Sequence, residues 1–317
     1  MKKIIGIILC AAMCAGLFCA CEANTDSGKL NIVTTIFPEY DWVKNIIGED
    51  SEKFELTMLL DSGVDLHSFQ PTADDIIKIS TCDLFIYVGG ESDEWVDDAL
   101  KESANKNMIV IDLLDVLGEN AKAEEAVEGM ELEETEEEPE ADEHVWLSVR
   151  NAQLFCEEIK NAVIKLDSEN AQKYEDNTAA YIQKLAALDG EFESAVNGAE
   201  NRTLIFGARF PFRYLVDDYS LSYYAAFSGC SAESEADFET IKFLADKVDE
   251  LNLSSVIMLE GTNHKIAQTV VSTAKSENVK ILTMDSMQSV DMNAVKNGAS
   301  YPDIMEKNLA ALKEALK

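Results

Sequence analysis

The sequence predicts an α/β protein of two similar lobes, each built on a parallel-type sheet, joined by one long rigid helix. Short apolar, β-branched segments alternate with amphipathic helical segments in both halves of the chain, which is typical of parallel sheets covered by helices. An unbroken helical pattern separates the halves, and 317 residues exceed the roughly 100–200 of a single domain. We therefore expect an N-terminal lobe at 30–166, a connecting helix at 167–198 and a C-terminal lobe at 199–317.

The first lobe is expected to open with a buried strand and then to alternate helices and strands. Its first segment (LNIVTTIF) is apolar and β-branched, and Pro38 is expected to end it. Asp74 and Asp75 mark the first turn of a later helix, where negative side chains are favourable. We expect strands at 30–37, 54–60, 84–88 and 108–112, and helices at 40–47, 72–80, 94–103 and 149–166.

The middle of the chain reads as one long helix that starts near Ser168, a residue suited to a helix cap, and runs to about Val196. At about 1.5 Å per residue it is roughly 40 Å long, the span of a whole lobe. One apolar stripe follows it, made of Tyr174, Tyr181, Leu185, Leu188 and Phe192. In the second lobe we expect strands at 202–206, 222–227, 255–259 and 279–284, and helices at 211–218, 237–252, 264–277 and 301–316.

The N-terminus has the layout of a secretory signal. Lys2 and Lys3 precede an apolar run at 4–20, and polar residues follow at once. The segment LFCAC at 17–21 resembles a bacterial lipobox, with Cys21 as the lipidated residue and 22–29 as a tether. We expect residues 1–21 to direct the protein to an extracytoplasmic site, lipid-anchored to the bacterial cell membrane. A plain signal peptide and an uncleaved anchor helix are the alternatives.

The chain is strongly acidic, with 60 Asp and Glu against 26 Lys and Arg. A net charge of −34 excludes nucleic acid as an electrostatic partner and raises the local concentration of cations. Residues 119–143 are rich in Glu, contain Pro139 and have no aromatic side chain. Because charges at this density repel one another, we expect a mobile acidic loop that is dispensable for folding.

The cysteines outside the signal segment are Cys82, Cys156 and Cys230. An odd number without metal-ligand spacing does not form a disulfide framework. We expect these side chains to be small buried hydrophobic groups rather than metal ligands.

Three histidines occur, and two of them lie where a loop meets a regular element. His67 follows the second expected strand, and His144 stands at the exit of the acidic segment. Ligand sites in open α/β sheets form outside the carboxyl ends of the strands, and neutral imidazole is a common metal ligand. Either residue alone is more often an ordinary polar side chain. His264 is expected to be an exposed surface histidine.

Two segments resemble one protein family, the metal-specific solute-binding proteins of ATP-driven zinc and manganese importers. DLHSFQPT at 65–72 is similar to its H-x-[YF]-x-P-[ST] motif, which implies that His67 is the first ligand. EHVWLS at 143–148 is similar to its H-x-W-L-[SD] motif, which implies that His144 is the second, although Val149 replaces a usual proline. The order of lobe, long helix and lobe also fits the resemblance.

At the family's third ligand position the alignment finds Arg209, in the segment RFPFRYL. Arginine stays protonated and cannot coordinate a cation, so we expect Arg209 to oppose metal binding. Either it pairs with Asp285 or Glu260 in the empty protein and swings away on closure, or it stays and the site is weak. A local shift of the register is the alternative. The fourth position of the family matches Asp285, and Glu260 is a further possible ligand. Glu233 and Glu235 match a stretch that lines the cleft or an interface in the family.

The resemblance implies a monomeric protein that captures a divalent transition metal between its lobes and delivers it to the membrane permease of an ABC importer. Two imidazoles favour zinc, and carboxylates leave manganese as the alternative. Arg209 also points to a rival, an adhesin-like or acidic surface lipoprotein with a vestigial metal site. A zinc hydrolase is the other rival, but the sequence lacks H-E-x-x-H, G-x-S-x-G and P-loop patterns, and Glu260 is the sole candidate base. We therefore do not expect an enzyme.

Overall fold

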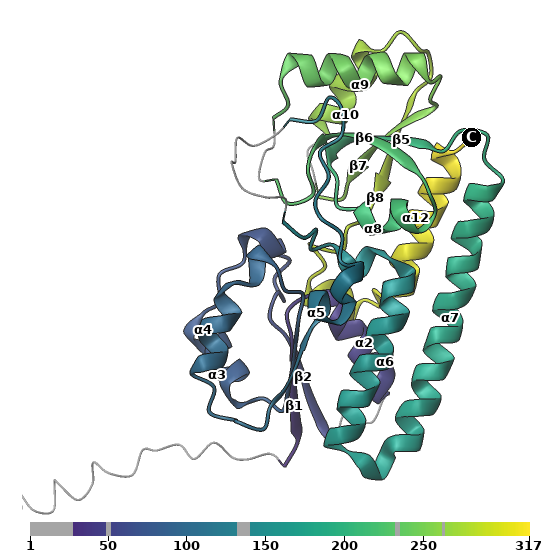
Figure 1. Ribbon diagram of the computed structural model, residues 1–317. Coiled ribbons are helices and arrows are strands. Elements are labelled where there is room, and N and C mark those ends of the chain that lie inside the picture. The colour runs from purple at the N-terminus through teal and green to yellow at the C-terminus, as the bar shows by residue number, and fades with distance from the viewer. Residues whose placement is uncertain (1–27, 49–51, 132–139, 232–234, 262–263) are drawn as a thin grey trace, which may run out of the picture.

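The computed structural model describes residues 28–48, 52–131, 140–231, 235–261 and 264–317 (Figure 1). The expected signal segment, Cys21 and most of the tether lie outside these described residues, as does Glu233. Within the described parts of the chain, none of the helices combines the length and the apolar character that crossing a membrane requires.

The N-terminal lobe contains a four-stranded parallel sheet in the order β2-β1-β3-β4. Its strands are β1 Leu30–Thr34, β2 Phe54–Met58, β3 Leu84–Tyr87 and β4 Ile109–Asp112. Its helices are α2 Phe37–Ile47, α3 Ala73–Thr81, α4 Trp95–Lys101, α5 Leu113–Leu117 and α6 Val149–Leu166. The first strand is shorter than expected, because Pro38 lies in the first turn of α2, where its missing N–H costs nothing, and does not end the strand.

The C-terminal lobe repeats this arrangement with a parallel sheet in the order β6-β5-β7-β8. Its strands are β5 Thr203–Arg209, β6 Ser222–Phe227, β7 Ser255–Leu259 and β8 Lys280–Met284. Its helices are α8 Arg213–Asp218, α9 Phe238–Glu250, α10 Lys265–Thr273, α11 Met292–Lys296 and α12 Tyr301–Ala315. In both lobes the first strand lies between the second and the third, which confirms two similar α/β lobes.

The long helix is α7, Ala171–Asn197, which runs beside both lobes (Figure 1). It begins three residues later than expected, because residues 168–170 form a 3-10 turn. The predicted apolar stripe is buried along its whole length. As expected, this long helix joins the two lobes, and it packs against α6 and α2 of the first lobe and against α12 of the second.

The two lobes share one apolar core that continues from the first sheet through the helices to α12. At its centre the ring of Trp42 lies 5.4 Å from that of Tyr301 and 5.6 Å from that of Phe155, measured between centroids. The buried carboxylate of Asp41 accepts the Tyr301 backbone N–H at 3.0 Å and the Tyr181 hydroxyl at 3.2 Å. These contacts join α2, α6, α7 and α12 in one packed group of helices, the helical base, which is shared by both lobes.

The acidic segment differs from the expected mobile loop in its described parts, residues 121–131 and 140–143, which we call the acidic strap. Ala123 pairs with Ala141 in an antiparallel bridge, and Glu131 pairs with Phe227 on the edge strand β6. Met130 is buried. The composition hid this packing because the backbone of the strap makes the hydrogen bonds, while Glu125, Glu128 and Glu140 stay exposed. Residues 132–139 lie outside the described residues.

The strap gives a stability prediction that reverses the expected dispensability of this segment. The Tyr214 hydroxyl donates to the Asp142 carbonyl at 2.9 Å and accepts the Lys122 N–H at 3.0 Å. Tyr214→Phe leaves both backbone groups without this partner and should lower the free energy of unfolding by about 1–2 kcal/mol. Urea unfolding measures it, with Tyr224→Phe as the control, whose hydroxyl makes no such bond among the described residues. Equal stability of the two variants would contradict the packed strap.

Candidate metal centre

Both motif histidines lie in loops at the cleft between the lobes. His67 sits in a 3-10 turn beyond β2, and the Asp65 carboxylate caps this turn by accepting the His67 backbone N–H at 3.1 Å. His144 immediately precedes another 3-10 turn, and Asp142 accepts its backbone N–H at 2.9 Å. Each histidine is therefore held at its backbone by a carboxylate two residues earlier in the chain.

The two imidazoles face each other although 77 residues separate them in sequence. Their Nε2 atoms lie 3.2 Å apart, and their ring centroids lie 5.2 Å apart. His144 is fully buried, and the His67 side chain is 13% exposed. The structure thus brings the two sequence-predicted histidines into one site.

The outer nitrogens of both rings contact carboxylates. Nδ1 of His144 lies 3.1 Å from Oδ1 of Asp142, and Nδ1 of His67 lies 3.3 Å from Oε2 of Glu143 and 2.8 Å from the Ser92 hydroxyl. An ionised carboxylate only accepts hydrogen bonds, so it favours the tautomer with the proton on Nδ1. The free electron pairs of both rings are then on Nε2 and point at the same space.

Glu143 is a buried carboxylate that remains charged. Burial acts to raise the pKa of Glu143, but its contacts with His67 and Ser92 outweigh burial and hold this pKa below its usual value. The Ser92 backbone N–H donates to Oε1 at 2.7 Å. Gly90 makes this approach possible, because its φ is 82° and a Cβ there would lie 2.5 Å from Oε1 of Glu143.

Cys230 is the third member of the site, and it was expected to be only a buried hydrophobic side chain. Its Sγ atom and one ring nitrogen each of His67 and His144 lie within 4.8 Å of one another. Cys82 and Cys156 are buried thiols, as expected. Burial, together with the charge of Glu124, raises the pKa of the Cys230 thiol. No spacing in the sequence signals this cysteine, because its partners come from distant loops.

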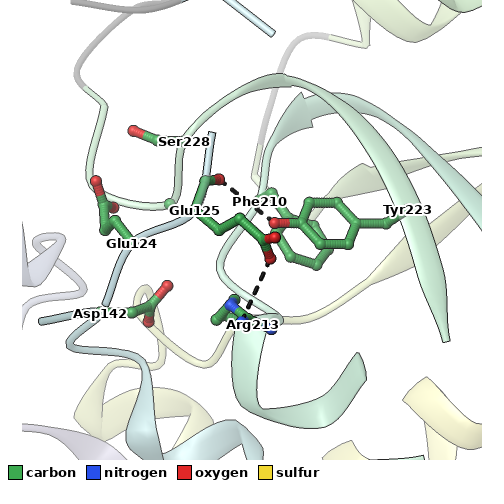
Figure 2. Close-up of a pocket in the computed structure, with 8 residues that line it drawn as sticks. Glu124, Glu125, Asp142, Phe210, Arg213, Tyr223 and Ser228 are labelled. Atoms are coloured by element: carbon green, nitrogen blue, oxygen red, sulfur yellow. Dashed lines mark hydrogen bonds and ion pairs between the residues drawn. The ribbon is translucent and has the colours of Figure 1, made fainter. Parts of the chain in front are cut away.

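The acidic strap of the first lobe contacts residues of the second lobe beside the site. Figure 2 shows Glu125 of the strap beside Arg213 and Tyr223, and its carboxylate lies 3.3 Å from the Arg213 guanidinium. The Tyr223 hydroxyl donates to the Glu125 carbonyl at 3.4 Å. Glu124 accepts the Cys230 backbone N–H at 3.0 Å. The small pocket lined by Glu124, Glu125, Arg213 and Tyr223, among others, has a volume of about 10 Å³, so it holds no more than about one water molecule.

Arg209 crosses the cleft and pairs with Asp65 of the first lobe, not with Asp285 or Glu260 as expected. Its guanidinium also donates to the Gln288 side chain at 3.3 Å. The Gln288 amide in turn lies 3.3 Å from Nε2 of His144. Gln288 is therefore a buried polar neighbour of the histidine pair that the sequence motifs did not identify.

Asp285 and Glu260 form a separate acidic pair on the second lobe. Among the described residues, neither carboxylate belongs to the group of mutually close ligand atoms around the histidines. Glu260 accepts the Ser286 N–H at 2.8 Å and the Ser286 hydroxyl at 2.5 Å, and Asp285 accepts the Met287 N–H at 2.7 Å. The loop that follows β8 still reaches the first lobe, because its Ser286 carbonyl accepts the Trp146 indole N–H at 2.8 Å.

The remaining candidates lie away from the histidine pair. His264 is exposed, in agreement with the prediction. Glu235 is also exposed.

Two parallel α/β lobes on a shared helical base, with imidazole and thiol groups converging between them, define a two-lobed binding protein with a candidate metal centre. The chain matches the family described as the periplasmic component A of the zinc-uptake complex over residues 32–315, and it belongs to this family. The resemblance seen in the two histidine motifs is thereby confirmed.

Several relatives are similar along most of this chain. The zinc-binding protein AdcA of Streptococcus pyogenes is 28% identical over 295 residues, which cover 90% of this chain and 56% of AdcA. The zinc-binding lipoprotein AdcA of Streptococcus pneumoniae is 30% identical, covering 99% of this chain and 61% of AdcA. This chain therefore spans little more than half the length of the AdcA relatives. The high-affinity zinc uptake system protein ZnuA of Bacillus subtilis is 29% identical, covering 99% of this chain and 98% of that protein.

Solved structures support the same fold. The Zn(II)-bound ZnuA-like domain of Streptococcus pneumoniae AdcA superposes with a TM-score of 0.71 at 27% identity, covering 91% of this chain and 99% of that domain. The metal-dependent lipoprotein YcdH of Bacillus subtilis superposes with a TM-score of 0.74 at 28% identity, covering 91% of this chain and all of the other.

The acidic pair gives a pH prediction for the metal-free protein. Burial and the charge of Asp285 raise the pKa of Glu260 from 4.5 to about 7. A raised acid pKa means that the folded protein favours the neutral form of Glu260. The contribution of Glu260 to the free energy of unfolding is therefore complete below pH 4.5 and is lost as pH rises through about 7. Glu260→Gln cannot ionise, so its stability should fall less than that of the wild type over this window. Urea unfolding in chelator at several pH values measures the difference, and exposed Glu277→Gln is the control. Parallel profiles for wild type and Glu260→Gln would contradict the assignment.

Proposed function

We propose that this protein captures a divalent transition metal, zinc in preference to manganese, between its two lobes and delivers it to the membrane permease of an ABC importer. The observation that carries the proposal is the pair of imidazoles, whose Nε2 atoms point at each other across 3.2 Å. Two free electron pairs at this distance repel, and either a shared proton or a metal ion removes the repulsion. A metal ion relieves this repulsion and binds to both rings.

The geometry fits zinc. Zn–N bonds are about 2.0–2.1 Å, so two imidazole nitrogens on a tetrahedral zinc ion lie about 3.3 Å apart. The observed separation of 3.2 Å is close to that value. The carboxylates behind His67 and His144 also fit, because a metal-bound imidazole usually donates its other N–H to a carboxylate or carbonyl. Such partners orient the ring and make it a better ligand.

In this proposal the first lobe, residues 30–166, supplies His67 and His144, and the second lobe, residues 199–317, completes the site. Asp285, with Glu260 beside it, is the carboxylate that the family motif implies. Asp285 lies three residues before Gln288, which already contacts His144. In the proposal, this loop brings the Asp285 carboxylate to the bound ion.

The relatives support zinc as the cargo. The AdcA proteins are named as zinc-binding, and the Bacillus subtilis relative is named as part of a high-affinity zinc uptake system. The family is one of metal transport rather than catalysis. We extend to this chain an extracytoplasmic location, lipid anchoring through Cys21 and function as a monomer.

The histidine pair gives the direct test of capture. His67→Ala and His144→Ala each remove a coordinating nitrogen, so each should weaken zinc binding by at least the 10–100-fold typical of losing an outer-shell partner. Competition against a chromophoric chelator measures the affinity. His264→Ala is the control, because this exposed histidine lies outside the site and should leave affinity unchanged. Wild-type zinc affinity in both site variants would rule the proposal out.

Arg209 gives a second test, with the opposite sign. Its guanidinium is a permanent cation that contacts Gln288, and Gln288 in turn contacts His144. Arg209→His removes this charge and adds an imidazole, so it should tighten zinc binding on the order of tenfold. Arg209→Gln removes only the charge and separates the two effects in titration calorimetry. Unchanged or weaker binding of both variants would show that Arg209 does not oppose the metal.

A further inference from the structure

The proposed site lacks a third ligand where the family motif expects one. Arg209 occupies that position, and its guanidinium is engaged with Asp65 and Gln288. Two imidazoles alone leave about half of a tetrahedral zinc shell unfilled. A donor that lies close to both rings and comes from another loop is therefore needed for tight capture.

Cys230 is positioned by contacts that bring its thiol to the two rings. It follows β6 through Ser228 and Gly229, and Glu124 of the acidic strap accepts its backbone N–H at 3.0 Å. Gly229 packs directly on the site, since a Cβ there would lie 3.0 Å from Cε1 of His144 and 2.9 Å from the Phe210 carbonyl. A side chain at 229 would push this loop, and with it the thiol, away from the histidines.

We propose that Cys230 is the third metal ligand, so that two imidazoles of the first lobe and one thiolate of the second hold the ion. This inference rests on the proposed capture function and specifies its donor set. On binding, the metal ion replaces the thiol proton, which is released to solvent, and a sulfur–metal bond forms.

The distances permit this geometry with little movement. With Zn–N of about 2.05 Å and Zn–S of about 2.3 Å, a tetrahedral ion places nitrogen and sulfur about 3.6 Å apart. The three ligand atoms already lie within 4.8 Å of one another. The difference between this limit and 3.6 Å is roughly 1 Å.

A thiolate also determines which metal the site prefers. Soft sulfur ligands favour zinc, whereas manganese prefers carboxylate and other oxygen ligands. The sequence motifs alone leave zinc and manganese as alternatives, because two histidines with one or two carboxylates suit both. Cys230 shifts this balance to zinc, and it also makes the bound ion a link between the lobes.

Cobalt(II) is the probe that distinguishes sulfur from oxygen and nitrogen ligation. We expect the purified protein to bind Co²⁺ with a strong thiolate-to-metal charge-transfer band in the near ultraviolet. Cys230→Ser should lose this band, and Cys82→Ala, which removes a buried thiol elsewhere in the first lobe, should keep it. Zinc affinity of Cys230→Ser should fall at least tenfold while manganese affinity changes little, measured by chelator competition.

The outcomes separate this inference from the function on which it rests. If wild-type protein binds Co²⁺ without the charge-transfer band, Cys230 is not a ligand, but capture stands as long as His67→Ala and His144→Ala weaken binding. If the band appears and persists in Cys230→Ser, another cysteine supplies the sulfur and the assignment is wrong. If no variant at either histidine changes affinity, the capture function itself fails. The wild-type spectrum needs no substitution, so a misfolded variant leaves this test intact.

Discussion

The carboxylates of Asp142 and Glu143 determine how the histidine pair is presented. Each lies behind one ring at Nδ1, and together they turn both Nε2 atoms toward the same point in the cleft. Both carboxylates are buried, so their charge is only weakly screened by solvent. A buried anion without a partner is costly, and the Nδ1–H groups of the imidazoles offset part of that cost. These two side chains thus place negative charge behind both imidazoles.

The helical base shared by the lobes holds the two lobes in a fixed arrangement. The shared core and the contacts of Asp41 with Tyr181 and Tyr301 join the lobes through helices rather than through a single connector. Rotating one lobe away from the other would expose much of this apolar surface to water, at about 25 cal/mol per Å². Adjustment around a ligand is therefore cheapest in the loops at the cleft, which carry His67, Cys230 and Gln288.

The site differs from the ligand pattern of its family in two ways, at Arg209 and at Cys230. Arg209 cannot coordinate a metal, but it neutralises Asp65 and orders Gln288 beside His144. Cys230 provides a donor atom from a different loop of the same lobe. In the proposed donor set, a thiolate also brings a negative charge to the divalent ion that a neutral imidazole would not bring.

The sequence by itself determined the two lobes, the alternation of helices and strands along each lobe, the long helix and the two histidines. These features depend on local patterns, namely β-branched runs, a stripe at helical spacing, and short motifs around His67 and His144. Only the tertiary structure decided the partner of Arg209, the packing of the acidic strap and the place of Cys230. Each of these involves contacts between segments far apart in the chain, such as the 144 residues that separate Arg209 from Asp65, the 106 that separate Cys230 from Glu124 and the 92 that separate Lys122 from Tyr214. A run of glutamates predicts a hydrated loop from its composition, and a single cysteine predicts nothing, until the fold shows which backbone groups and which imidazoles lie beside them.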